Sequence, residues 1–175
     1  MDGTFAGGVV RVGGDARQRF HDAHGYGRPL DRNRIELSPV EAAHLLSRDD
    51  LDAVVDASES GPEPADDASD ADRLGFRAFL ARTGTALRFT VYKDLRDRGF
   101  YLSPARPEWP GVGRDVESGA RDADAPPGSP VDFVVYPRGK GPWDDAVAHR
   151  VRVVGEREGV PAASLGGVVL AVVDE

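Results

Sequence analysis

The sequence predicts an α/β (α+β) fold, with a small mixed N-terminal subdomain and an α/β C-terminal subdomain built on a central mixed sheet. Three observations lead to this prediction. A well-signalled helix follows short β-rich runs near the N-terminus, an acidic stretch divides the chain, and three nearly continuous apolar runs close it after a second helical pattern. At 175 residues the chain is long enough to bury a core without disulfides.

The N-terminal elements are predicted from local signals. Residues 4–12, "TFAGGVVRV", and residues 33–37, "NRIEL", are each expected to form a strand, with a polar, Gly-rich connection between them. "SPVEAAHLL" predicts a helix because Ser38 is an N-cap, a proline takes the first helical position, and Glu41 completes a capping box. His44 lies on this helix without a second metal-binding group four residues later, so we expect a packed histidine.

An acidic stretch separates the two predicted subdomains. Residues 56–72 contain seven acids, no bases and two prolines. Such a segment cannot bury enough apolar surface to order itself, so it is interpreted as an acidic flexible linker. The predicted organisation is therefore an N-terminal subdomain at 1–55, the linker at 56–72 and the C-terminal subdomain at 73–175.

The second part begins with apolar residues at helical spacing. Phe76, Phe79 and Leu80, then Leu87, Val91 and Leu95, predict a helix that ends where Gly99 can take a left-handed conformation. "FYLSP" predicts a strand, and residues 105–130 are interpreted as a long surface insertion. The closing runs "VDFVVY", "HRVRVV" and "GVVLAVVDE" predict strands that are covered on both faces.

Composition restricts the partners and the compartment. The net charge is −8, and the cations are 20 Arg and 2 Lys, which fits either a salt-tolerant, halophilic surface or a GC-rich genome. An acidic chain does not attract nucleic acid by simple electrostatics, so RNA binding would need a local basic patch. The absence of cysteine excludes disulfides and thiolate metal sites, and suggests a reducing compartment. Without a signal peptide or a membrane-length apolar run, the chain is expected to be cytoplasmic, with no membrane partner.

One ordered set of motifs resembles a known family. "VYKDLRDRGFYL" is followed by "DFVVYPRG" and then by a single histidine that leads a strand. This order resembles the archaeal tRNA-intron (tRNA-splicing) endonucleases, whose helix carries Y-x-D-L-R-x-R-G before a D-F-x-x-Y strand, a loop and a histidine. The resemblance covers most of residues 85–175, and "SPVEAAHLL" resembles the helix of the family's N-terminal subdomain. It implies a nuclease-like C-terminal subdomain.

The resemblance also implies a reaction. The family removes introns from precursor tRNA at bulge-helix-bulge sites, without a metal or cofactor, and leaves 2′,3′-cyclic phosphate and 5′-hydroxyl ends. Tyrosine, histidine and lysine supply the base, the acid and the cation for this RNA lyase chemistry. Tyr136 matches the tyrosine and His149 matches the histidine. From the residues alone, Tyr136 also fits a half-buried aromatic with a hydroxyl partner, and His149 fits a strand-edge histidine.

The lysine position departs from the family's pattern. In the family, lysine directly precedes the last apolar strand, but this chain has Gly166 and Gly167 there. Lys140 is the nearby lysine, in a different connection among turn-forming glycines and a proline. A substitute role for Lys140 stays open.

The end of the sequence is a second departure. Asp174 and Glu175 match the beginning of an acidic loop that, in the family, docks into a basic cleft of another unit and precedes a further strand. The chain is therefore expected to be truncated at its last strand. It resembles the degenerate N-terminal repeat of the family's two-repeat form, and the two acids are candidates for an assembly contact.

These features predict a structural and assembly unit of a tRNA-intron endonuclease. Arg138, Lys140 and Arg150 would form its local basic patch for RNA. Its expected partners are precursor tRNA and a second, catalytic repeat or subunit, in a homo- or hetero-oligomer. Two alternatives stay open: an active endonuclease unit that uses Tyr136 and His149, and an RNA-binding module unrelated to splicing.

Overall fold

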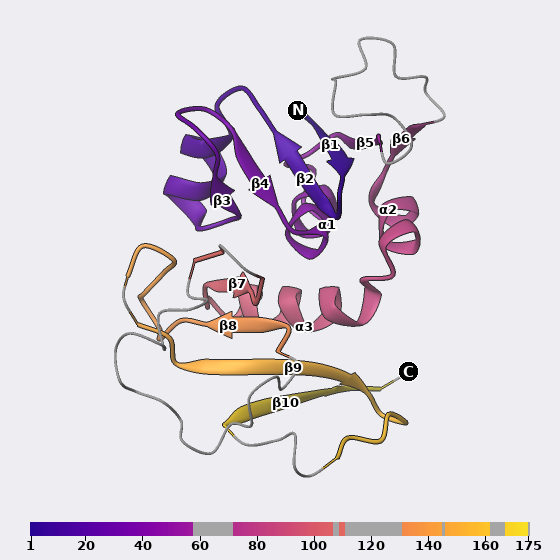
Figure 1. Ribbon diagram of the computed structural model, residues 1–175, viewed down its shortest axis with the longest axis vertical. Helices are drawn as coiled ribbons and strands as arrows, with labels where there is room; N and C mark the ends of the chain where they lie inside the picture. Colours follow the sequence, from indigo (N-terminus) through magenta and orange to yellow (C-terminus); the bar gives the residue numbers. More distant parts are fainter. Residues whose placement is uncertain (58–71, 107–108, 111–130, 145, 162–166, 175) are drawn as a thin grey trace. The chain divides into compact units, whose positions relative to one another are not determined.

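The structure is a computed structural model that describes residues 1–57, 72–106, 109–110, 131–144, 146–161 and 167–174. The chain forms two compact units, residues 1–89 and residues 90–175 (Figure 1). Within the described residues, the first unit holds a six-stranded sheet and the second a four-stranded sheet, each combined with helices. The predicted α+β fold class is confirmed. Most of the predicted linker and of the predicted 105–130 insertion lies outside the described residues.

The first unit begins with a hairpin where the sequence pattern predicted one strand over residues 4–12. Strand β1 (Asp2–Ala6) pairs antiparallel with β2 (Val9–Val12). Gly7 and Gly8 between them have φ angles of 59° and 76°, the left-handed pair that a two-residue hairpin turn requires. The single-strand prediction was wrong because the adjacent glycines reverse the chain.

The remaining strands complete the first sheet. Its order is β3-β4-β2-β1-β5-β6, in which β1 and β5 are parallel and the other pairs are antiparallel. These strands are β3 (Arg28–Pro29), β4 (Ile35–Leu37), β5 (Ala53–Asp56) and β6 (Arg73–Leu74). Strand β4 confirms the strand predicted at 33–37. The connection from β2 to β3 contains a short π-helix, η1 (Arg17–Asp22).

Helix α1 (Pro39–Ser47) begins at the predicted residue. The Ser38 hydroxyl accepts the Glu41 N–H, while the Glu41 carboxylate accepts the Ser38 N–H at 2.8 Å, so the capping box is complete. The second carboxylate oxygen of Glu41 accepts the N–H of Gly27 at 2.7 Å. His44 is 2% exposed, and its Nδ1 lies 2.8 Å from the Tyr26 hydroxyl. The prediction of a packed histidine is confirmed.

The single helix predicted to run to Gly99 is two helices. Helix α2 (Phe76–Thr83) ends at Gly84, which has φ 62° and donates its N–H to the Leu80 carbonyl. A second helix, α3 (Ala86–Asp97), follows and ends before Gly99, which has φ 86° as predicted. The periodicity missed the break because Gly84 terminates α2 with a left-handed cap while the apolar spacing continues across it.

The second unit pairs its strands in the order β10-β9-β8-β7. The strands are β7 (Leu102–Pro104), β8 (Phe133–Val135), β9 (His149–Gly155) and β10 (Val168–Val173), as the apolar runs predicted. Strands β9 and β10 are parallel, and the other pairs are antiparallel. Strand β8 is fully buried, but Val169 and Val172 of β10 are 49% and 57% exposed, so burial on both faces is wrong for β10.

Within the described residues, no helix has the length and apolar character that crossing a membrane requires.

Substitution of two glycines of the first unit distinguishes the cost of backbone strain from the cost of steric overlap. Gly7 and Gly27 both have positive φ, but a Cβ on Gly7 would meet nothing within 4 Å, whereas one on Gly27 would lie 2.2 Å from the Glu36 carbonyl oxygen. We expect Gly7→Ala to lower the free energy of unfolding by about 1 kcal/mol and Gly27→Ala by at least about 2 kcal/mol. Urea unfolding of both variants measures the difference. Equal losses would contradict the close approach at Gly27.

The buried carboxylate of Glu36 predicts acid sensitivity. Its side chain is 5% exposed and binds Arg11 at 3.1 Å and Arg28 at 2.7 Å. Burial raises the pKa of Glu36, but the hydrogen bonds from the two guanidinium groups outweigh it and hold the pKa below its usual 4.5. The stabilisation is therefore complete above pH 4.5 and is lost as the pH falls through the lower folded-state value.

We expect Glu36→Gln to reduce the stability at neutral pH and to flatten its fall in acid. Urea unfolding at a series of pH values measures both effects. Glu158→Gln, at a half-exposed surface carboxylate, is the matched control. An acid profile that is the same for wild type and Glu36→Gln would rule out Glu36 as a source of the acid sensitivity.

Candidate functional site

Three positions of interest meet at one edge of the second sheet. His149 is the first residue of β9 and lies opposite Val135, the last residue of β8. Tyr136 follows Val135, and Gly167 directly precedes Val168, which pairs with the residue after His149. Because β8 is antiparallel to β9 while β10 is parallel to it, the end of β8 and the starts of β9 and β10 lie together (Figure 1). The fold therefore gathers the positions predicted for tyrosine, histidine and lysine.

Tyr136 is held inside the unit. Its side chain is fully buried, and its hydroxyl lies 2.9 Å from the Ser103 hydroxyl of β7. Its backbone N–H donates to the Tyr101 carbonyl at 3.0 Å, which extends the pairing of β7 with β8 by one position. The phenol hydroxyl thus has a neutral side-chain partner in the core of the sheet, which is the arrangement of a structural tyrosine.

His149 has a different environment. It is exposed at the start of its strand, and its side chain lines a groove of about 700 Å³. The groove is bounded by α3, by the facing parts of β9 and by β10, and most of its lining is valine and leucine. Tyr136 is not among the described residues that line it. The accessible imidazole and the buried phenol therefore do not share this groove.

The lysine position carries no side chain. Gly167 has φ 65°, a left-handed conformation that glycine adopts freely and that other residues adopt at a cost of about 1–2 kcal/mol. Gly166 lies outside the described residues. The residue beside His149 can therefore supply neither a charge nor a hydrogen-bonding side chain.

The predicted RNA-binding and assembly residues lie on different parts of the unit. Arg138 and Lys140 belong to the loop between β8 and β9, where the Arg138 guanidinium lies over the Phe100 ring and Lys140 faces Asp144 at 3.6 Å. Arg150 is the second residue of β9 and is partly buried. Asp174 follows β10 at the far end of the groove, about 20 Å along the strand from Gly167. Glu175 lies outside the described residues.

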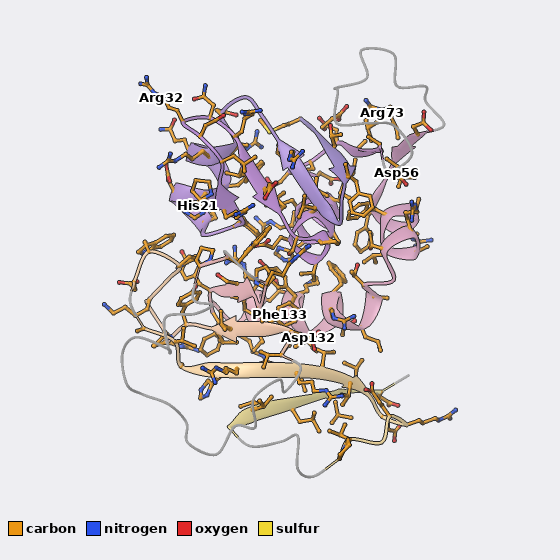
Figure 2. The ribbon with its side chains drawn as sticks, viewed as in Figure 1. His21, Arg32, Asp56, Arg73, Asp132 and Phe133 are labelled. Carbon is orange, nitrogen blue, oxygen red and sulfur yellow. The ribbon has the colours of Figure 1, made fainter. Side chains whose placement is uncertain are left out.

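Asp132 has a structural contact at the start of β8. Its carboxylate accepts the Val153 N–H at 2.8 Å, while its own N–H donates to the Val151 carbonyl. Figure 2 labels Asp132 and the neighbouring Phe133 at this end of the strand. Within the described residues, no group of three or more histidine, aspartate or glutamate side chains could hold a metal ion. The aspartate of the D-F-x-x-Y pattern therefore fastens β8 to β9.

Comparison with known proteins assigns the chain to a family. Residues 1–63 match the family model described as "tRNA intron endonuclease, N-terminal domain". The whole chain is 59% identical to a tRNA-splicing endonuclease of Haloferax volcanii, covering 43% of that protein. It is 51% identical to one of Halobacterium salinarum, covering 42%, and 32% identical over 157 residues to one of Methanosarcina mazei, covering 33%. The chain belongs to the tRNA-intron endonuclease family.

The matches to the two haloarchaeal endonucleases cover all of this chain, and the match to the Methanosarcina mazei protein covers 87% of it. The chain spans less than half the length of each tRNA-splicing endonuclease named above. The Y-x-D-L-R-x-R-G pattern of this family member lies on α3 and the turn that follows it.

Sequence reasoning missed the partner of Tyr136. The sequence pattern places Ser103 in the strand "FYLSP" but predicts no contact for it, because it lies 33 positions before Tyr136. The available signal was strand alternation. With β7 and β8 antiparallel, residues 103 and 136 fall on neighbouring positions of one sheet face, because Ser103 pairs with Val134.

The buried hydroxyl pair predicts a structural effect of Tyr136. We expect Tyr136→Phe and Ser103→Ala each to lower the free energy of unfolding by about 1 kcal/mol, because each leaves a buried hydroxyl or an unfilled space. The double variant is expected to lose less than the sum of the two. His149→Ala, at an exposed position, serves as the control and is expected to change stability by less than about 0.5 kcal/mol. Full additivity of the double variant would contradict the contact.

Proposed function

We propose that this chain is the structural and assembly unit of a tRNA-splicing endonuclease that removes introns from cytoplasmic precursor tRNA at bulge-helix-bulge sites. The observation that carries the proposal is the glycine beside His149. The fold aligns the start of β10 with the start of β9, yet the aligned position has no side chain. A second unit of the family, with lysine at the corresponding place, would perform the cleavage.

The chemistry of RNA cleavage supports this division of roles. Attack by a ribose 2′-hydroxyl on the neighbouring phosphate gives a 2′,3′-cyclic phosphate, while the 5′-oxygen leaves with a proton. Charge builds up on the non-bridging phosphate oxygens, and a cation beside them stabilises the transition state. Loss of one such group costs about 100-fold or more in rate, by analogy with a lost oxyanion donor.

The environment of Tyr136 supports the same conclusion. A general base must come within hydrogen-bond reach of the proton that it removes. The Tyr136 hydroxyl is buried, at hydrogen-bond distance from Ser103, so a substrate hydroxyl could reach it only after the pairing of β7 with β8 opened. His149 is accessible and would act as an acid or base only with partners supplied from elsewhere.

The alternative of an active unit depends on Lys140. Its ammonium faces Asp144 in the loop between β8 and β9, and its side chain is 54% exposed. An exposed, paired lysine is a weaker stabiliser of phosphate charge than one fixed in a site away from water. This makes substitution of Lys140 for the missing lysine the less favoured proposal.

The assembly role is supported by the length of the relatives and by the end of β10. A second unit in tandem would account for the remaining length of the tRNA-splicing endonucleases that this chain matches. Asp174, exposed after β10, would contribute to a contact with a basic surface of that second unit. The proposed partners are therefore precursor tRNA and a lysine-bearing unit, joined in a homo- or hetero-oligomer.

A cleavage assay tests this function. A 5′-labelled bulge-helix-bulge RNA is incubated in a chelator with the purified chain, with a lysine-bearing unit of the family, and with both together. We expect cleavage that needs the lysine-bearing unit and is accelerated by this chain. The accelerated rate should not change with His149→Ala in this chain.

Two outcomes would contradict the proposal. A cyclic-phosphate product from the chain alone, lost in Lys140→Ala, would establish the active-unit alternative. No acceleration of the mixture, together with equal binding of hairpins with and without bulges, would favour an RNA-binding module unrelated to splicing.

A further inference from the structure

An exposed tryptophan stands out on the second unit. Trp143, in the loop between β8 and β9, is 51% exposed, whereas the other tryptophan, Trp109, is 5% exposed. A large aromatic ring left half in water forgoes much of the free energy that burial would give. Tryptophan is enriched at binding interfaces, because its ring offers a large apolar face together with a polar N–H.

The ring of Trp143 is fixed before any partner arrives. It meets the Tyr101 ring edge-on, with centroids 5.3 Å apart and planes at 66°. It also occupies the space above Gly141, where a Cβ would lie 2.7 Å from the indole. Binding to a ring that is already in place avoids the entropy cost of ordering a mobile side chain.

The loop that carries the ring is held by its own hydrogen bonds. The Lys140 N–H donates to the Pro137 carbonyl and the Asp144 N–H to the Gly141 carbonyl, both at 2.9 Å. The Asp144 carboxylate accepts the Gly141 N–H at 2.7 Å. These bonds close two consecutive turns, which keep Trp143 on a stable base.

Cations surround the aromatic rings. The Arg96 guanidinium lies 5.2 Å from the centroid of the Tyr101 ring that supports Trp143, and the Arg138 guanidinium lies 5.3 Å from the Phe100 ring. The loop between β8 and β9 holds two cations, Arg138 and Lys140, and two acids, Asp144 and Asp145, so its sequence carries no net charge in a chain of net charge −8. Aromatic rings interleaved with cations are typical of surfaces that bind single-stranded nucleic acid.

We infer that Trp143, supported by Tyr101, is a stacking platform for an unpaired nucleobase of RNA. A base offers a flat ring to the open face of the indole, and its phosphates favour the nearby cations. In a continuous duplex the bases are covered by their neighbours, so the fitting ligand is single-stranded. This inference rests on the proposed function only for the identity of the RNA as precursor tRNA.

Stacking suits an acidic chain better than phosphate contacts do. Binding through phosphates weakens steeply as salt rises, because it depends on the release of counterions. Stacking has no such dependence on charge and is tolerant of base sequence. The platform would let a chain of net charge −8 hold RNA in salt that screens its few local cations.

Intrinsic fluorescence tests the inference on the 175-residue chain, because its two tryptophans differ in exposure. The probes are an unstructured single-stranded RNA oligonucleotide and the same strand annealed to its complement, in about 1 M KCl, where the Debye length is about 3 Å. We expect the single strand to quench the emission and the duplex to leave it unchanged. Trp143→Phe should abolish the quenching, because only Trp109 then emits.

Affinity provides the second readout. We expect Trp143→Ala to weaken single-strand binding about 10-fold, measured by the anisotropy of labelled RNA. Leu30→Ala, which removes another exposed apolar side chain from the first unit, is the matched control and should leave the affinity unchanged. An unchanged affinity in Trp143→Ala, or equal quenching by the duplex, overturns the inference.

A further outcome also overturns it. If the Trp143 emission shifts with protein concentration in the absence of RNA, the ring is covered by another copy of the chain. The fluorescence test and the cleavage assay can fail independently of each other. Cleavage by the mixture of units with no quenching by single-stranded RNA rejects the platform alone, and quenching without accelerated cleavage rejects the proposed function alone.

Discussion

The parallel pairing of β9 with β10 is the constraint on which the candidate site depends. It places the starts of two strands at one edge of the sheet, where antiparallel β8 also ends. A shift of the register by one residue would move His149 away from Gly167 and would turn the valines of β10 to the other face of the sheet. Parallel neighbours need a crossover between them, so the register is maintained by tertiary pairing and not by a tight turn.

In the first unit, one carboxylate has a comparable role. Glu41 binds Ser38 to begin α1 and binds the N–H of Gly27 to fix the turn before β3. The helix start and the neighbouring turn are thus joined through a single buried carboxyl group. A polar group with 1% exposure is tolerated because hydrogen bonds surround it, and its removal would leave donors in two elements without their acceptor.

The sequence was informative where the signal is local. The capping box at Ser38, the strand at β4 and the closing apolar runs were all predicted because neighbours in the chain determine them. Gly84 and the Gly7–Gly8 pair were missed as breaks because apolar periodicity continues across them while the backbone turns. Exposure of Val169 and Val172 could not be read from an apolar run, which is the same whether one face or both faces are covered.

The candidate site was predictable in its positions and not in its environments. The resemblance to the endonuclease family brought attention to Tyr136, His149 and Gly167, and the strand pairing puts these three positions at one edge. The burial of Tyr136 depends on Ser103, a contact across 33 residues that only the sheet reveals. The Trp143 platform depends in the same way on Tyr101 and Arg96, which precede it by more than 40 positions.

The glycine at position 167 is more than a missing side chain. Its φ of 65° belongs to the left-handed region, so the backbone that leads into β10 has adopted a conformation that lysine reaches only with strain. A lysine at this position would either adopt the strained backbone conformation or shift the start of the strand. A shift would disturb the pairing with β9 that aligns His149. The geometry that keeps the sheet regular is therefore at odds with a lysine at this position. The proposed structural role fits this backbone better than the acquisition of the missing charge.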